Sequence, residues 1–337
     1  DGGDGTIDVI VSARDGQVIM VEVHDALFRS RLAKLGITYS GGIKTAIIEI
    51  AEAAGSAILK PYERQTMVAT SYGVGEMILS AVGHGCSRII VGLGGSIVSD
   101  GGIGMAQALG ITFVDQEGNP LEPIGNVGFN ALSLTEIESI KMDKLKLDVE
   151  QLEILVASDV DIRLTGADGQ ARNFGPQKNA NSVEIHYLEE GFKNLARVIR
   201  KVFARSVDIP LAGAAGGLGA GLMGFLGGNL HLGSRLVAEE INLQAKIEQC
   251  DFVIVGEGCL DHTTLRNKGP QFVGKLAKQM NKRVLAIVGM ARQNSYSFYD
   301  RLFTCERDGQ TFTEITPECI RNQLEYVAAK VAQTALA

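Results

Sequence analysis

Five carboxylates follow or end short apolar runs of this sequence, where they could hold a metal ion. They are Asp100, Asp159, Asp161, Glu257 and Asp261. Metal-assisted phosphoryl transfer needs such hard oxygen ligands, together with cations that neutralise the charge on the transferred group. The cations that we expect to serve this purpose are Lys178 and Lys268. The competing interpretation of each carboxylate is a helix cap or a solvated loop charge.

The glycine-rich segment Gly92–Gly102 is the first candidate phosphate-binding loop. It follows an apolar run and precedes a helical stretch, so its backbone N–H groups could face an anion where the helix dipole favours negative charge. The residues expected to bind the phosphates here are Gly94, Gly95, Ser96 and Gly101. Asp100 would serve as a magnesium ligand or as a catalytic acid or base. The alternative is a tight loop in which Asp100 caps the helix.

A second glycine-rich run covers residues 211–221. Its glycines expected at a phosphate are Gly213, Gly216, Gly217 and Gly219. The spacing Gly219-x-Gly221-x-x-Gly224 matches the dinucleotide fingerprint by letter, but no clear apolar strand precedes it. We therefore expect close backbone approach to a phosphate here. Tight helix packing through small residues remains the alternative.

Apolar runs that end in glycine or acid must position these residues. Four of them lie at residues 88–95, 153–159, 251–258 and 283–289. Continuous Val, Ile and Leu runs are typical of parallel strands buried on both faces, with helices covering the sheet. Ligands of open α/β sheets bind at the carboxyl ends of the strands, so we expect the chemistry at that edge.

The region 17–50 differs, because alternating segments separated by turn signals indicate strands of a mixed sheet. The helices predicted from apolar periodicity span residues 71–82, 182–204, 235–248 and 317–335. The uncharged segment 209–230 is long enough to cross a membrane, but it contains a proline and eight glycines. We expect a glycine loop that leads into a buried helix.

Composition narrows the class of protein. The chain has 337 residues and 45% hydrophobic residues, which predicts two domains with ample core. A net charge of −7 without a basic run argues against nucleic-acid binding. Five scattered cysteines without ligand spacing argue against zinc and disulfides and fit reduced, cytoplasmic thiols. We expect no membrane partner, and a homo-oligomer is compatible with the sequence.

Six ordered segments together resemble the type I glycerate kinase family. They are Asp1-Gly-Gly-Asp-Gly-Thr6, Thr70–Glu76, Gly94–Gly102, Phe174-Gly-Pro-Gln-Lys178, Gly213–Gly219 and Gly256-Glu-Gly-Cys-Leu-Asp261. The similarity extends over essentially the whole chain. The sequence begins inside the first of these segments, so we expect it to be N-terminally incomplete, without the family's opening strand and its Asp-Ser-Phe-Lys motif.

The resemblance implies an α/β fold of two domains with the active site in the cleft between them. One would be a flavodoxin-like parallel sheet formed by residues 1–15 and 231–337. The other would be an inserted mixed-sheet domain, likened to restriction endonucleases, formed by residues 16–230. The implied reaction is the magnesium-dependent transfer of a phosphoryl group from ATP to D-glycerate, which gives 2-phosphoglycerate.

Residue roles follow from this resemblance as hypotheses. Asp159 and Asp261 would coordinate magnesium and take part in catalysis, and Asp100 would accept the glycerate hydroxyl proton. The glycerate carboxylate would be held by Lys178 or Lys268, with Arg64. Departures from the family pattern surround Asp159 and Asp261, where Ile162-Arg163 and His262-Thr263-Thr264 stand. They leave open a ligand-binding or altered-specificity relative, and the Gly219–Gly224 spacing leaves open an NAD(P)-dependent oxidoreductase.

Overall fold

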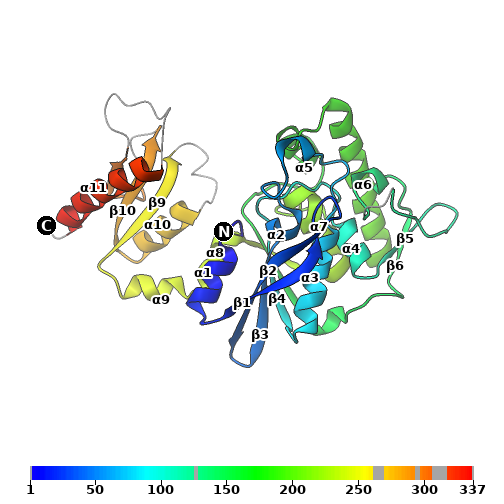
Figure 1. Ribbon diagram of the computed structural model, residues 1–337, viewed down its shortest axis with the longest axis horizontal. Coiled ribbons are helices and arrows are strands. Elements are labelled where there is room, and N and C mark those ends of the chain that lie inside the picture. The colour runs from blue at the N-terminus through cyan, green and yellow to red at the C-terminus, as the bar shows by residue number, and fades with distance from the viewer. Residues whose placement is uncertain (1, 125–127, 261–268, 293–296, 306–316, 336–337) are drawn as a thin grey trace. The chain divides into compact units, whose positions relative to one another are not determined.

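The computed structural model describes residues 2–124, 128–260, 269–292, 297–305 and 317–335 (Figure 1). The chain forms two compact units, Asp1–Val237 and Ala238–Ala337. This division differs from the expected domain borders, because residues 1–15 lie in the first unit with the region that follows them. The assignment of residues 1–15 and 231–337 to one domain stays a prediction.

The first unit is built on a six-stranded mixed sheet with the order β1-β2-β3-β4-β7-β8. The first three strands pair antiparallel, and β3, β4, β7 and β8 run parallel to one another. The strands are β1 (Gln17–His24), β2 (Ser30–Ser40), β3 (Ile43–Glu49), β4 (Arg88–Gly92), β7 (Glu153–Ser158) and β8 (Asn229–Leu232). A separate hairpin pairs β5 (Thr112–Val114) with β6 (Ser139–Lys141). The mixed sheet expected from residues 17–50 is confirmed.

Helices of this unit surround the sheet. They are α1 (Thr6–Ala13), α2 (Ala51–Ala54), α3 (Tyr72–Gly83), α4 (Ile103–Ala108), α5 (Gln170–Phe174), α6 (Ser182–Phe203), α7 (Ala214–Leu226) and α8 (Gly233–Glu240). The described residues of this unit also form the 3-10 turns η1 (Pro61–Glu63), η2 (Ala131–Ser133), η3 (Val149–Gln151) and η4 (Pro176–Lys178). The helices predicted at 71–82 and 182–204 are confirmed as α3 and α6.

Strand β2 shows how both faces of the sheet are covered. A Cβ atom at Gly36 would come within 2.9 Å of Val11 and 3.1 Å of Ile7, so α1 packs closely on that face. The neighbouring Leu35 and Ile37 point to the opposite face, because side chains alternate along a strand. There they join the main core with α3.

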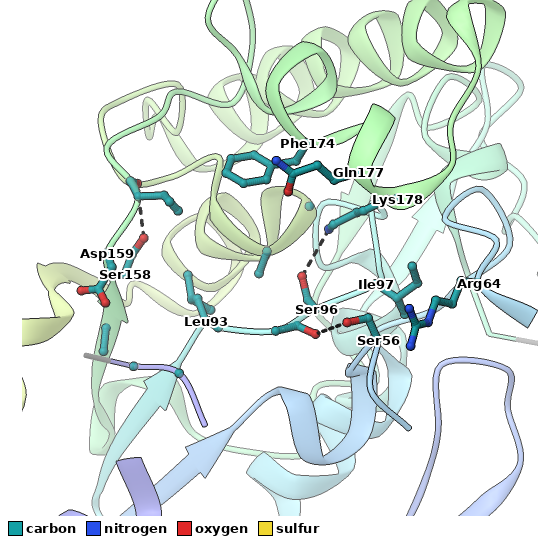
Figure 2. Close-up of a pocket in the computed structure, with 18 residues that line it drawn as sticks. Ser56, Arg64, Leu93, Ser96, Ile97, Ser158, Asp159, Phe174, Gln177 and Lys178 are labelled. Carbon is teal, nitrogen blue, oxygen red and sulfur yellow. Dashed lines mark hydrogen bonds between the residues drawn. The ribbon is translucent and has the colours of Figure 1, made fainter. Parts of the chain in front are cut away.

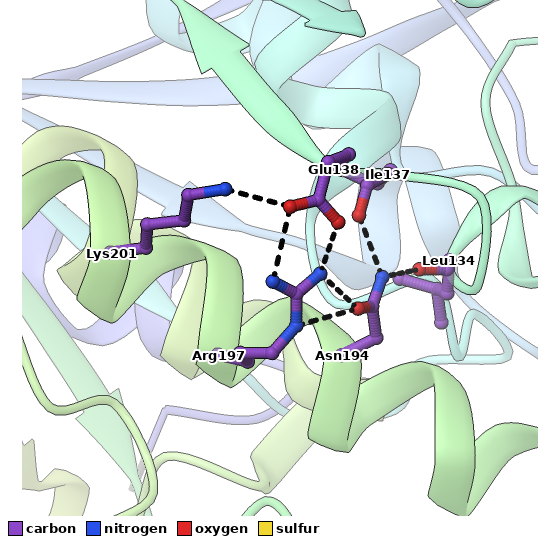
Figure 3. Close-up of polar contacts among 6 residues, drawn as sticks. All are labelled: Leu134, Ile137, Glu138, Asn194, Arg197 and Lys201. Carbon is purple, nitrogen blue, oxygen red and sulfur yellow. Dashed lines mark hydrogen bonds and ion pairs between the residues drawn. The ribbon is translucent and has the colours of Figure 1, made fainter. Parts of the chain in front are cut away.

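Helix α6 is fixed at both its beginning and its last turns. Asn181 accepts hydrogen bonds from the backbone N–H groups of Val183 and Glu184, which satisfies donors that a helix start leaves free. Towards its end, Arg197 and Lys201 both form 2.7 Å ion pairs with Glu138, which precedes β6 (Figure 3). These cations lower the pKa of Glu138 to about 2.

The glycine-rich segment 209–230 forms α7 and the turns around it. Ala215, Gly216 and Gly217 have positive φ angles of 53°, 68° and 82°, so the regular helix begins after them. Its residues, among them Leu218 and Phe225, are buried in the core of the unit, as the sequence predicted. No helix among the described residues is long and apolar enough to cross a membrane.

The second unit contains the parallel sheet β11-β10-β9. Alternate residues of β10 face two layers: Val284 packs with Ala277 of α10, and Leu285 packs with Val327 of α11. The elements are α9 (Leu243–Glu248), β9 (Phe252–Leu260), α10 (Gly269–Gln279), β10 (Arg283–Ala291), β11 (Arg301–Thr304) and α11 (Pro317–Ala335). The helix predicted at 317–335 is confirmed.

Two sequence-based expectations are corrected by this arrangement. All four apolar runs are parallel strands, but β4 and β7 belong to one sheet and β9 and β10 to another, so they share no common edge. The helix predicted over 235–248 is two helices, α8 and α9, because Asn242 adopts a left-handed φ of 51° between them. Apolar periodicity cannot reveal such a break, since it does not report the backbone conformation of a single residue.

Candidate active site

A pocket of about 390 Å³ opens in the first unit at the carboxyl ends of β4 and β7 (Figure 2). Three stretches of backbone line it: Gly2–Gly3 before α1, residues 93–97 after β4, and residues 157–160 at the end of β7. For β4 and β7, the pocket therefore lies at the carboxyl ends of the strands, as the strand pattern predicted.

The segment after β4 can approach a ligand closely because its glycines lie against backbone. A Cβ atom at Gly92 would come within 2.5 Å of the Gly2 oxygen, and one at Gly94 within 2.4 Å of the Gly3 Cα. Gly95 has a φ of 72°, and its oxygen accepts hydrogen bonds from the Ser56 backbone N–H and hydroxyl. Gly94, Gly95 and Ser96, which the sequence selected, all line the pocket.

Gly101 lies behind the pocket instead of in its wall. Its backbone N–H donates to the Gly216 oxygen at 2.9 Å, and a Cβ atom there would come within 2.3 Å of Leu195. Gly101 and Gly102 have φ angles of 62° and 81°, which turn the chain into α4. The role of Gly101 is therefore packing and turn geometry.

Only Gly216 of the four selected glycines in the second run lines the pocket. A Cβ atom at Gly216 would come within 1.9 Å of the Val98 oxygen. One at Gly213 would come within 2.2 Å of the Arg163 oxygen, and one at Gly217 or Gly219 would meet side chains or backbone within 3.0 Å. Tight packing, the alternative weighed above, thus describes Gly213, Gly217 and Gly219.

Lys178 is the buried cation of the pocket. Only 8% of the residue is exposed, and its Nζ donates hydrogen bonds to the Val98 oxygen at 2.6 Å and to the Ser96 hydroxyl at 3.2 Å. Burial lowers the pKa of its amine to about 7, and the negative charge of Asp100 acts in the opposite direction. Pro176 starts the 3-10 turn η4, which ends on Lys178 and places it there.

Two further charged side chains line the pocket, Arg64 and Asp159 (Figure 2). Arg64 donates from its Nε to the Leu59 oxygen at 3.3 Å. Asp159 accepts a 3.2 Å hydrogen bond from the backbone N–H of Ser234 at the start of α8. Burial raises the pKa of the Asp159 carboxyl to about 6, and backbone N–H groups of α8 partly oppose this shift.

Asp100 belongs to the segment after β4 but does not line the pocket. Its exposed fraction is 0%, and its two carboxylate oxygens accept hydrogen bonds from Ser71, Gly102 and Gly104. Burial raises the pKa of this carboxyl, and these hydrogen bonds oppose the rise. The capping alternative raised for Asp100 fits this environment.

Two selected residues, Asp261 and Lys268, lie outside the described residues. Asp161 is exposed and does not line the pocket. Glu257 belongs to the second unit, where it lines a separate, mainly apolar hollow of about 660 Å³ between the sheet and α11. The structure thus brings together Arg64, Asp159 and Lys178.

Pocket residues not selected from the sequence include Ser56, Ser158, Phe174 and Gln177. Phe174 and Gln177 belong to the segment Phe174–Lys178, so that segment was a usable signal. No sequence signal marked Ser56. It reaches the loop through an isolated antiparallel bridge between Gly55 and Ser96, which are far apart in the sequence.

The donor set around the pocket fits a sparsely ligated magnesium ion. Among the described residues, no group of three or more His, Cys, Asp and Glu side chains could hold a metal ion. Magnesium keeps several waters and is usually bound through one or two carboxylates and the phosphates of the substrate. Asp159, a partly buried carboxylate in the pocket wall, meets that requirement.

Comparisons with known proteins agree on one family. Residues 1–336 match the model of the glycerate kinase family. The chain is 39% identical over 301 residues to the glycerate kinase of Halalkalibacterium halodurans, an alignment that covers 89% of this chain and 77% of that protein. It is 40% identical over 290 residues to the glycerate 2-kinase of Escherichia coli, with 86% and 74% covered.

A solved structure supports the same relationship. The crystal structure of a protein from Salmonella typhimurium LT2 described as a putative glycerate kinase 2 superposes with a TM-score of 0.84 at 34% sequence identity. The superposition covers 100% of this chain and 86% of that chain. The two-unit α/β fold is thus shared with that protein.

Proposed function

Because this chain belongs to the glycerate kinase family, we propose that it transfers the terminal phosphoryl group of ATP to D-glycerate and releases 2-phosphoglycerate and ADP. The observation that carries this proposal is the pocket at the ends of β4 and β7. It combines a backbone loop suited to phosphate with two cations, Arg64 and Lys178, and one carboxylate, Asp159. Such a set suits two anionic substrates and a hydrated metal ion.

The cations suit the carboxylate of glycerate. The Lys178 ammonium donates two of its three N–H groups to Val98 and Ser96, so the third can bind an anion in the pocket. The Arg64 guanidinium brings further donors from the part of the wall to which Ser56 and Arg64 contribute. We assign the substrate carboxylate to these two residues, and Lys268 remains an additional candidate outside the described residues.

The backbone of Gly94, Gly95 and Ser96 suits the phosphates of ATP. The Gly94 N–H already donates to the Gly2 oxygen at 2.9 Å, and the Gly95 oxygen accepts from Ser56, so the N–H groups of Gly95 and Ser96 are the ones that would face an anion. Gly216 approaches the same wall without a side chain. Positioning and charge neutralisation supply most of the catalysis in phosphoryl transfer, which needs no covalent intermediate with the protein.

Asp159 would hold a magnesium ion, with Asp261 as the second carboxylate proposed from the sequence. A bound magnesium ion neutralises charge that develops on the phosphate oxygens. The relatives described above are glycerate kinases, so they lend no support to an oxidoreductase or to a non-catalytic relative. We place the reaction in the cytoplasm.

The test is a coupled assay of ADP release with ATP, magnesium and D-glycerate, with L-glycerate and no-substrate controls. Phosphorus NMR of the product would distinguish 2-phosphoglycerate from 3-phosphoglycerate. We expect turnover that depends on D-glycerate. Stabilisation by ATP and magnesium without turnover on D-glycerate would contradict the substrate assignment.

A further inference from the structure

The Asp100 carboxylate is fully used by the protein itself. Its Oδ2 accepts from the Ser71 backbone N–H at 2.7 Å, the Ser71 hydroxyl at 2.8 Å and the Gly104 N–H at 3.3 Å. Its Oδ1 accepts from the Gly102 N–H at 3.1 Å. Four donors surround a group whose exposed fraction is 0%. In this conformation the carboxylate is closed off from a substrate hydroxyl.

These donors belong to the beginnings of two helices. Ser71 immediately precedes α3, and Gly102 and Gly104 stand at the start of α4. The Ser71 hydroxyl in turn accepts from the Met105 N–H at 2.9 Å, which links the two helix starts directly. Asp100 therefore holds the far end of the segment 94–102, whose near end, Gly94 to Ile97, lines the pocket.

Asp100 also acts on the pocket through Lys178. The Lys178 Nζ is bonded to Val98 and Ser96 of the same segment, and the charge of Asp100 favours the protonated amine against its burial. Segment 94–102 and α7 contain no other ionisable side chain. Arg64 and Asp159 are the remaining charged side chains in the pocket wall. Removal of the Asp100 charge should therefore lower the pKa of Lys178.

We infer that Asp100 is a positioning residue: its carboxylate fixes the segment 94–102 at the starts of α3 and α4 and keeps a negative charge near Lys178, the amine that binds the anionic substrate. The inference rests on the proposed function only in the last clause. It replaces the sequence-based expectation that Asp100 accepts the glycerate hydroxyl proton.

Two variants separate position from charge. Asp100→Asn keeps the shape and removes the charge, while it turns an NH₂ group towards the Gly102 N–H or the donors of Ser71. Ser71→Ala removes one hydroxyl of the same network and keeps the Asp100 charge. Both should lower the thermal midpoint, whereas only Asp100→Asn should change the titration of Lys178.

The kinetic readout is the pH dependence of the glycerate KM. For Asp100→Asn we expect a KM raised about tenfold at pH 7.5, a kcat lowered by less than about tenfold, and an alkaline rise in KM that begins at lower pH. Ser71→Ala should leave the pH at which KM rises unchanged. A kcat lowered by about 10²–10⁴ with an unchanged KM is the result expected for a lost general base and would overturn the inference.

Two measurements need no turnover. Amide hydrogen exchange at Ser71, Gly102 and Gly104 should be slow in the wild type and faster in Asp100→Asn. Carbon NMR of labelled lysine should show Lys178 losing its proton at lower pH in Asp100→Asn than in the wild type. If both changes are seen while the wild type shows no turnover with glycerate, the proposed function fails and the positioning role stands. Unchanged exchange together with an unchanged Lys178 titration would refute the positioning role.

Discussion

Lys178 donates a 2.6 Å hydrogen bond from its Nζ to the main-chain oxygen of Val98, two residues before the buried carboxylate of Asp100. An amine and a carboxylate are thus both enclosed around one short loop. Removal from water disfavours the charged form of each group, so burial lowers the pKa of Lys178 and raises the pKa of Asp100. Such an arrangement is expected where a loop must be held rigidly and must also present charge to a ligand.

The substitution Lys178→Met should raise stability and strongly lower activity. The pKa of the amine is lowered from 10.5 to about 7 in the folded chain, so between these pH values the unfolded chain binds a proton that the folded chain lacks. Wild-type stability therefore rises with pH across this window. The gain from Lys178→Met should be largest below about pH 7 and shrink as pH approaches 10.5, in denaturant melts.

The activity of Lys178→Met should fall by about 100-fold or more in kcat/KM, because a preorganised donor to the substrate anion is lost. The matched control is Lys144→Met, at an exposed lysine outside the pocket. Lys144→Met should change neither the stability nor kcat/KM appreciably. Retained activity in Lys178→Met would remove Lys178 from the substrate site.

The substitution Asp159→Asn should weaken the magnesium dependence of turnover. It removes one charged ligand and keeps the shape of the side chain, so we expect kcat/KM to fall by about 10²-fold or more and the magnesium concentration for half-maximal rate to rise. Asp143→Asn, at an exposed aspartate outside the pocket, is the control. An unchanged magnesium titration would argue against Asp159 as a ligand.

The substitution Gly216→Ala should be strongly destabilising. The added Cβ would lie within 1.9 Å of the Val98 oxygen, at a backbone φ of 68° that side chains rarely adopt. We expect a loss of about 1–3 kcal/mol from strain, together with a displaced loop and reduced activity. Gly83→Ala, at the end of α3, meets nothing within 4 Å and should instead be neutral or slightly stabilising. Equal midpoints for the two variants would contradict the predicted close approach.

The substitution Glu138→Gln should lower stability modestly and in a pH-dependent way. Arg197 and Lys201 hold the Glu138 pKa at about 2, below its ordinary value of 4.5. The charged carboxylate therefore contributes stability above about pH 4.5, and that contribution is lost as pH falls towards 2. The difference between wild type and variant should shrink over this range and also in high salt, because the pairs are exposed. A difference that persists at pH 2 would assign the effect to something other than charge.

Local sequence patterns were sufficient for most of the elements. The buried strands β4 and β7 appear as continuous apolar runs, because both faces of a central parallel strand are covered. Helix α6 appears through its apolar period, which depends only on residues within a few turns of one another. The glycines at Gly94 and Gly95 indicated a place of close backbone approach, and the structure places both in the wall of a pocket.

Long-range packing determined the roles of individual residues within those patterns. The glycine loop around Asp100 predicts a magnesium ligand or a catalytic acid or base, yet Ser71, 29 residues earlier in the chain, donates hydrogen bonds to its buried carboxylate. Gly216 lines the pocket while Gly217 beside it packs against Gly101. The side of a loop that faces a ligand depends on which distant segments occupy the other side. The amino-acid pattern therefore specifies strands, helices and the need for close approach, and the assembled core specifies which carboxylate and which glycine reach the pocket.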